Sequence, residues 1–281
     1  MTRHFGGDMT TATPWPPPTG PSVGWHGVGP QRAYFDGQHW SRDDPPSLTT
    51  AAVVVGVLVV SLLVAYPFVD VGESAGVPVP VLAVSLIMLG YAPALGVAVM
   101  LLRRDTGGVA WLSTVAARAT WSDLGWGVLV WFGAILAQAV VFGLVDSSGI
   151  PISDNTGALG DESTGVDLVV ITAIAAVVIA PVVEEFVFRG VVLRALVARI
   201  GVARGVAVQG VLFGAAHIDP AAGVGNIGLA LVLSGVGMVF GAAVMRFGRL
   251  GPAIVAHAVF NGVVVALVVS GVADRLVEQM G

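Results

Sequence analysis

The side chains of this chain that could do chemistry stand inside long apolar runs. Two adjacent carboxylates, two imidazoles and an amide interrupt these runs, at Glu184, Glu185, His217, His257 and Asn261. A carboxylate can take a proton from water as a general base. Imidazole and amide N–H groups can stabilise the oxyanion of a tetrahedral intermediate. Brought together in a dry pocket, these residue types indicate hydrolysis.

Spacing suggests different tasks for the two glutamates. Residues four apart lie on one face of a helix, and Glu185 precedes Arg189 by four with the acid first, the better order for an ion pair. Glu184 is rotated by about 100° from its neighbour. We therefore expect Arg189 to hold Glu185 and to leave Glu184 free for chemistry.

The same four-residue spacing recurs in the two later runs. His257 and Asn261 would present an imidazole and an amide together, and the Phe213 ring would pack under the His217 imidazole and fix it. Glutamate and histidine are also zinc ligand types, so Glu184, His217 and His257 form the candidate set if the site needs a metal. No zinc ion or other cofactor is firmly predicted.

Other hydrolytic designs lack their residues. The chain has no cysteine, which excludes a thiolate nucleophile and thiolate metal sites. Neither a Gly-x-Ser-x-Gly elbow nor a His-Glu-x-x-His zinc motif is present.

Composition places the chain in a membrane. Of its 281 residues, 56% are hydrophobic and 11% are charged, against about 25% charged in soluble domains. The net charge of −5 gives no electrostatic basis for binding nucleic acid. We expect an all-α, polytopic bundle of about seven transmembrane helices in the lipid bilayer. The seven apolar runs are 51–69, 78–102, 124–145, 166–188 (extending as helix to about 200), 205–218, 225–245 and 252–270.

Arginine predicts the orientation, because the 13 basic residues include no lysine. With seven spans, all but Arg275 fall on one side of the membrane. The positive-inside rule then predicts a cytoplasmic N-terminus and an outer C-terminus.

Two segments outside the spans carry further expectations. Residues 1–48 are rich in Pro, Gly and Trp without a signal-peptide core, and predict a mostly irregular cytoplasmic extension before a membrane domain at 49–272. The stretch 103–122 is apolar enough to suggest an interfacial helix. The pairs Gly210/Gly214 and Gly237/Gly241 could let helices approach closely.

Three motifs resemble one family. Glu184-Glu185-Phe186-Val187-Phe188-Arg189, Phe213-Gly214-Ala215-Ala216-His217 and His257-Ala258-Val259-Phe260-Asn261 are similar to the motifs of the CAAX-protease and bacteriocin-processing family of intramembrane endopeptidases. Pro181 before the glutamates is also typical. The resemblance spans about residues 125–270 and carries the expected protease core.

The resemblance implies roles for the motif residues. Glu184 and His217 would activate water, His257 and Asn261 would form the oxyanion hole, and Glu185 with Arg189 would support the site. The substrate would be a peptide or a membrane protein. Prenyl-protein processing, known for eukaryotic relatives, is not implied by any residue of this chain.

The extension shows a second resemblance. Gly24-Trp25 followed by Tyr34-Phe35-Asp36-Gly37-Gln38-His39-Trp40 is similar to a short Trp-rich domain of unknown function on actinobacterial membrane proteins. An Asp-Gly turn between aromatic strands accounts for the pattern.

Two other function classes remain open at this point. Intramembrane Glu and His also serve proton-coupled transporters, although no inverted repeat is evident. A non-catalytic membrane scaffold could retain the same motifs.

Overall fold

The computed structural model describes residues 24–26, 33–35, 40–41, 45–106, 111–153, 159, 165–218 and 225–271. In the extension it contains an antiparallel sheet of three short strands, β1 (Gly24–His26), β2 (Ala33–Phe35) and β3 (Trp40–Ser41), in the order β1-β2-β3. Strands β2 and β3 flank Asp36 and Gly37, as the aromatic pattern predicted. The Asp-Gly turn itself lies outside the described residues.

The membrane domain is helical, which confirms the predicted fold class. Its helices in chain order are α1 (Leu48–Ser74), α2 (Val79–Thr106), α3 (Trp111–Thr114), α4 (Asp123–Ser147), α5 (Val166–Ile174), η3 (Ala175–Ile179), α6 (Ala180–Glu184), η4 (Glu185–Leu193), α7 (Arg194–Ile200), α8 (Val202–Ala215), α9 (Gly225–Phe247) and α10 (Gly251–Val269). Each of the seven apolar runs forms a helix within a few residues of its predicted bounds.

Six of these helical stretches are long and apolar enough to cross a bilayer, within the part of the chain that the structure describes. The protein is therefore a multi-pass membrane protein. The seventh run forms α8, whose 14 residues span about 21 Å, less than the roughly 30 Å of a hydrocarbon core. The predicted orientation counted this run as a full span. The orientation of the two termini therefore stays a prediction.

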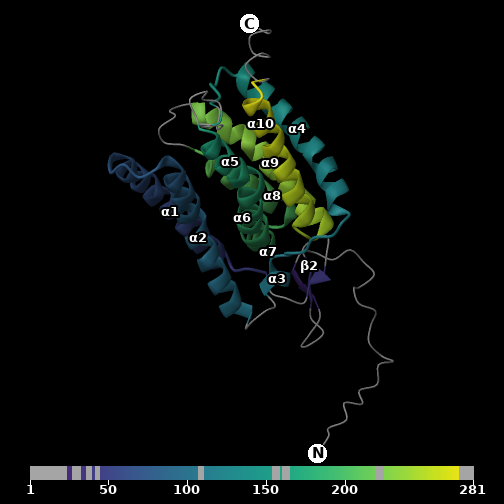
Figure 1. Ribbon diagram of the computed structural model, residues 1–281. Coiled ribbons are helices and arrows are strands. Elements are labelled where there is room, and N and C mark those ends of the chain that lie inside the picture. The colour runs from purple at the N-terminus through teal and green to yellow at the C-terminus, as the bar shows by residue number, and fades with distance from the viewer. Residues whose placement is uncertain are drawn as a thin grey trace, which may run out of the picture.

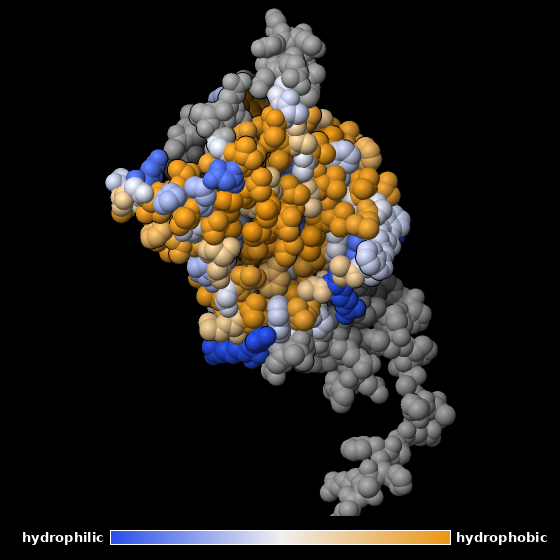
Figure 2. Space-filling view, viewed as in Figure 1, coloured by the Kyte–Doolittle hydropathy of each residue, from blue (hydrophilic) through white to orange (hydrophobic). Residues whose placement is uncertain are grey.

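The helices form two groups that Figure 1 separates clearly. A hairpin of α1 and α2 lies beside the continuous stretch α5–α7, and α4, α8, α9 and α10 pack on the other side. Apolar surface covers the visible face of the helices, and hydrophilic surface gathers toward their ends (Figure 2). This distribution matches a bundle surrounded by lipid.

Glycines bring α8 and α9 into direct backbone contact. A Cβ added at Gly210 would lie 2.9 Å from the Ser234 carbonyl oxygen, and one at Gly237 would lie 3.1 Å from Gly210 Cα. At Gly214 an added Cβ would overlap the Ala230 carbonyl oxygen. The close approach expected from the two glycine pairs is confirmed, because no larger side chain fits at these positions.

The connection between α2 and α4 differs from the interfacial helix suggested by its sequence. Its described part contains only the four-residue helix α3, and residues 115–120 are not helical. Its apolar residues divide between the core and the surface. Trp111 packs edge-on against Phe186, with ring centroids 6.1 Å apart, and Val115 is fully buried. Leu112 and Trp121 are exposed, at 46% and 91%.

Candidate active site

The glutamates lie in the middle of one long helical stretch. Residues Val166–Ile200 run without a break for 35 residues, through α5, η3, α6, η4 and α7. Two of these segments, η3 and η4, are π-helical. π-helical turns are rare and often occur at functional sites. Here they bracket the five-residue segment α6, which ends at Glu184, and η4 begins at Glu185.

Pro181 explains the first wide turn and gives Asn261 a partner. In η3 the Ala180 N–H reaches back to the Ala175 carbonyl, so the next carbonyl, Ala176, would pair with residue 181. Proline has no N–H to donate. Asn261 on α10 supplies the missing donor, with its Nδ2 2.7 Å from the Ala176 oxygen.

A tight helical hairpin brings His217 to the glutamates. Gly201, at a positive φ of 79°, reverses the chain between α7 and α8, and the glycine at position 205 lets α8 approach Val197. Glu184 lies 17 residues before Gly201 along one arm, and His217 lies 16 residues after it along the other. Two arms of nearly equal length place these residues at the same depth.

This hairpin also explains how the glutamates and His217 can meet. If the runs 166–188 and 205–218 each crossed the membrane from end to end, the glutamates would lie near one face and His217 near the other. The run that contains the glutamates, however, does not end at residue 188 but continues to Ile200. The carboxylates therefore lie far from the end of the helix, opposite the end of the short α8.

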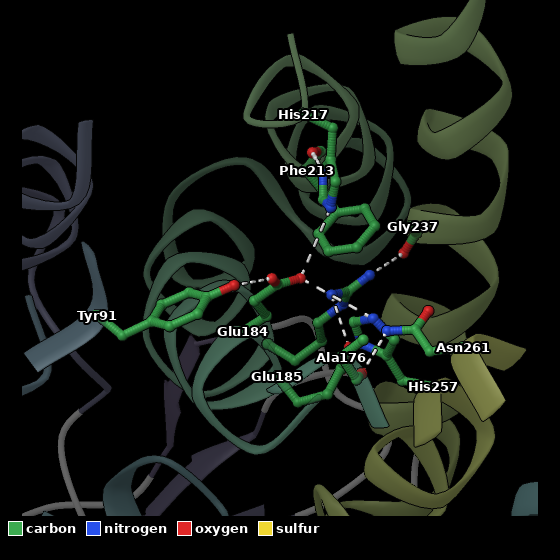
Figure 3. Close-up of polar contacts among 10 residues, drawn as sticks. Tyr91, Ala176, Glu184, Glu185, Phe213, His217, Gly237, His257 and Asn261 are labelled. Atoms are coloured by element: carbon green, nitrogen blue, oxygen red, sulfur yellow. Dashed lines mark hydrogen bonds and ion pairs between the residues drawn. The ribbon is translucent and has the colours of Figure 1, made fainter. Parts of the chain in front are cut away.

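Glu185 is the fully buried member of the carboxylate pair. Its Oε1 accepts a hydrogen bond from Arg189 Nη1 at 2.8 Å. The same oxygen accepts a second one from His257 Nδ1 at 2.9 Å (Figure 3). The side chains of Glu185 and Arg189 are both 0% exposed. A buried carboxylate is tolerated when it is paired and hydrogen-bonded. The structure thus contains the predicted ion pair and adds an imidazole to it.

Arg189 is held by more than its acid. Its Nη2 donates to the Gly237 carbonyl on α9 at 3.1 Å. Its guanidinium carbon lies 4.2 Å from the centroid of the Phe213 ring and 5.3 Å from that of Phe240. A guanidinium over an aromatic face is attracted by the ring quadrupole. The arginine therefore joins η4 to both α8 and α9.

Glu184 has a different environment from its neighbour. Its Oε1 accepts a hydrogen bond from the Tyr91 hydroxyl of α2 at 2.6 Å. Its Oε2 is buried with no hydrogen-bond partner among the described residues. This free oxygen lies 3.8 Å from His217 Nε2 and 3.9 Å from His257 Nε2 (Figure 3).

Both imidazoles are oriented through their other nitrogen. His217 Nδ1 lies 2.8 Å from the Phe213 carbonyl oxygen, and His257 Nδ1 lies 2.9 Å from Glu185. Because both partners are acceptors, each Nδ1 must carry the proton. The Phe213 ring also lies against His217, with centroids 4.7 Å apart, as its spacing predicted. The Nε2 atoms are thereby directed toward Glu184.

The space between Glu184 Oε2 and the Nε2 atoms of the two histidines suits a water molecule or a metal ion. The separations are too long for direct hydrogen bonds, and a water molecule in contact with all three atoms is a chemically reasonable occupant. The same donor types are those of zinc. No set of three or more His, Cys, Asp or Glu side chains in the described ranges is close enough to hold a metal ion in this conformation.

The structure brings together most of the residues chosen from sequence. Glu184, Glu185, Arg189, Phe213, His217 and His257 form one connected cluster. Asn261 lies beside it on α10, one turn beyond His257, with one amide hydrogen donated to Ala176. The roles assigned to these residues remain predictions.

Sequence reasoning missed Tyr91 and the Gly237 carbonyl. Tyr91 belongs to α2, outside the motif-bearing half of the chain. Its signal was weak but present, since the chain has only 3 tyrosines and this one carries a hydroxyl inside an apolar run. A backbone carbonyl such as that of Gly237 gives no sequence signal.

Comparison with known proteins gives one match. The family model described as Rce1-like, type II CAAX prenyl endopeptidase Rce1-like, matches residues 166–263. The match covers the central helical stretch, α8, α9 and the part of α10 that carries His257 and Asn261. No curated protein matches, and neither does any solved structure.

Proposed function

Because residues 166–263 match the Rce1-like model of type II CAAX prenyl endopeptidases, we propose that this membrane protein is an intramembrane endopeptidase that hydrolyses peptide bonds at Glu184. The family supports endopeptidase activity in general. One observation carries the specific proposal: the buried, unbonded Oε2 of Glu184 faces two imidazole nitrogens at 3.8 and 3.9 Å. A general base requires this kind of free, directed oxygen.

In the proposed reaction, Glu184 and His217 hold and activate water. Glu184 Oε2 removes one proton, and the water oxygen forms a bond to the carbonyl carbon of the substrate. The resulting tetrahedral intermediate collapses as the carbon–nitrogen bond breaks. The proton held by Glu184 then passes to the leaving amine, which returns the carboxylate to its starting state.

His257 and Asn261 are the proposed donors to the oxyanion. His257 can donate from Nε2 only as a protonated ring, because its Nδ1–H is directed at Glu185. Asn261 still has its second amide hydrogen after bonding Ala176. Preorganised donors of this kind can lower a barrier substantially.

The chemistry of the site also fits a zinc ion, held by Glu184, His217 and His257. Each imidazole is already oriented by an acceptor at Nδ1, the usual arrangement around metal-ligating histidines. When bound, zinc would supply Lewis-acid activation of water. In either case Glu185 and the Phe213 carbonyl orient the two rings.

The proposal is tested with the full chain purified in detergent and a peptide library. Glu184→Ala and His217→Ala should each reduce cleavage by about 10²–10⁴-fold, while the exposed acid variant Glu73→Gln should cleave like wild type. Circular dichroism and size-exclusion chromatography check that all variants fold. Equal cleavage by wild type, Glu184→Ala and His217→Ala would overturn the mechanism.

A chelator arm separates the two modes of water activation. Loss of cleavage on chelation, restored by zinc, selects the metal-bound form. Unchanged cleavage selects the metal-free form. Partner binding that survives in Glu184→Ala, together with no cleavage by wild type, would instead identify a scaffold.

A further inference from the structure

Tyr91 enters the site from a part of the chain that the family match does not cover. It lies on α2, and its hydroxyl reaches Glu184 Oε1 at 2.6 Å across the boundary between the α1–α2 hairpin and the central helical stretch (Figure 3). The matched segment begins only at residue 166. The hairpin therefore contributes a polar group directly to the carboxylate on which the proposed function rests.

The contact distinguishes the two oxygens of Glu184. A carboxylate can rotate about its last side-chain bond, and this terminal torsion is broad. With Oε1 bound to Tyr91, Oε2 is the oxygen that faces His217 and His257 at 3.8 and 3.9 Å. Within the described residues Oε2 has no other partner. One hydroxyl thus fixes which oxygen is available as a base.

Glu185 is oriented by other donors. Its Oε1 receives two donors and is fully buried. Among the described residues no arginine is hydrogen-bonded to Glu184, since Arg189 Nη1 is directed at Glu185 and Nη2 at the Gly237 carbonyl. Neutral Tyr91 can therefore hold Glu184 in place without neutralising its charge.

We infer that Tyr91 is a positioning residue for the reaction at Glu184. It acts through the carboxylate and does not itself exchange a proton with the substrate. This inference rests on the proposed function, because it assumes that Glu184 activates water. The alternative is that Tyr91 only joins α2 to the core, as polar side chains between membrane helices often do.

Tyr91→Phe separates these two roles, since it keeps the ring and removes only the hydroxyl. A positioning role predicts a fall in kcat of about ten- to a hundredfold with little change in KM, given the strength of a hydrogen bond to a charged group. The matched control is Ser85→Ala on the same helix, whose hydroxyl donates to the Val81 carbonyl of that helix. That variant should retain wild-type kcat.

A second measurement detects the contact without relying on cleavage. The chain has 3 tyrosines, so labelling with 3-fluorotyrosine gives three fluorine resonances, and Tyr91→Phe identifies one of them. Glu184→Gln should shift the Tyr91 resonance and leave the other two unchanged. No shift would overturn the contact.

The outcomes distinguish failure of the inference from failure of the function. If wild type cleaves and Tyr91→Phe cleaves with equal kcat, positioning is wrong while the endopeptidase proposal stands. If only the thermal midpoint falls in Tyr91→Phe, the hydroxyl is structural. If wild type cleaves no peptide, the proposed function fails, and with it the catalytic role of Tyr91, even when the fluorine shift shows the contact.

Discussion

The central helical stretch meets unlike surroundings on its two sides. Toward α8, α9 and α10, Glu185 shares a fully buried network with Arg189 and His257. Toward α2, Glu184 meets a single tyrosine hydroxyl and two imidazole nitrogens that it does not touch. Adjacent carboxylates thus acquire different properties from their partners, and the side with fewer contacts is the one free to react.

The largest expected effect comes from removing the cation of the buried network around Glu185. Arg189→Met should lower the free energy of unfolding by about 3–5 kcal/mol, because it leaves the Glu185 carboxylate buried without its cation. Reversible denaturation in bicelles measures this value. The double variant Glu185→Gln/Arg189→Met removes the stranded charge and should recover part of the loss. Wild-type stability in Arg189→Met would contradict the contrast between the two sides.

A steric change on the same side tests the glycine contact. Gly214→Val should lower the free energy of unfolding by about 1–3 kcal/mol, since the new side chain would overlap Ala230 and lie against Ser234. It should also reduce cleavage by displacing His217. Gly143→Val on α4 is the control, because a Cβ there has no neighbour within 4 Å. Equal losses in both variants would assign the effect to valine itself.

Asn261 has two proposed roles, one structural and one catalytic. Asn261→Leu should cost about 1–2 kcal/mol of stability by leaving the Ala176 carbonyl without its donor. Amide hydrogen exchange should increase around residues 175–181 and remain unchanged in α1. A drop in cleavage with no change in exchange would show that its main role is catalytic.

The smallest loss of stability is expected at Arg249, outside the network of Glu185 and the contacts of Glu184. Arg249 Nε donates to Asp123 Oδ1 at 2.8 Å and joins the start of α4 to the turn before α10. The arginine side chain is 22% exposed and that of Asp123 2%. Because Asp123 keeps the Thr120 N–H and hydroxyl as donors, Arg249→Ala should lower the free energy of unfolding by only about 1–2 kcal/mol. Thermal unfolding at low and high salt measures it. A loss as large as that of Arg189→Met would mean that burial does not explain the contrast.

Much of the fold could be predicted because lipid imposes a simple rule on sequence. A helix is the only way for an apolar run to satisfy its backbone in hydrocarbon, and the seven runs became helices near their predicted ends. The error at residues 103–122 has a physical cause. Tryptophan and valine suit the membrane interface and the protein core equally well, so the sequence carried no signal that Trp111 would pack against Phe186 or that Val115 would be buried.

The site could be predicted in part, for a similar reason. Spacing on one helix is readable, and the Glu185–Arg189 pair and the Phe213–His217 stacking follow from it. Contacts between helices depend on register, which spacing does not give. The bonds of Tyr91 to Glu184 and of Asn261 to Ala176 are of this second kind.

The short helix α8 has a consequence for the reactant itself. The last four carbonyls of a helix have no hydrogen-bond donor within the helix itself, yet all four at the end of α8 accept a hydrogen bond. Those of Leu212, Gly214 and Ala215 accept the backbone N–H groups of residues 216, 217 and 218, and that of Phe213 accepts His217 Nδ1. A water molecule arriving at this helix end finds no free backbone carbonyl in its last turn to bind. Glu184 Oε2, which has no hydrogen-bond partner among the described residues, lies 3.8 Å from His217 Nε2 beside this helix end. Water that reaches the helix end therefore finds an acceptor at the position where it would be consumed.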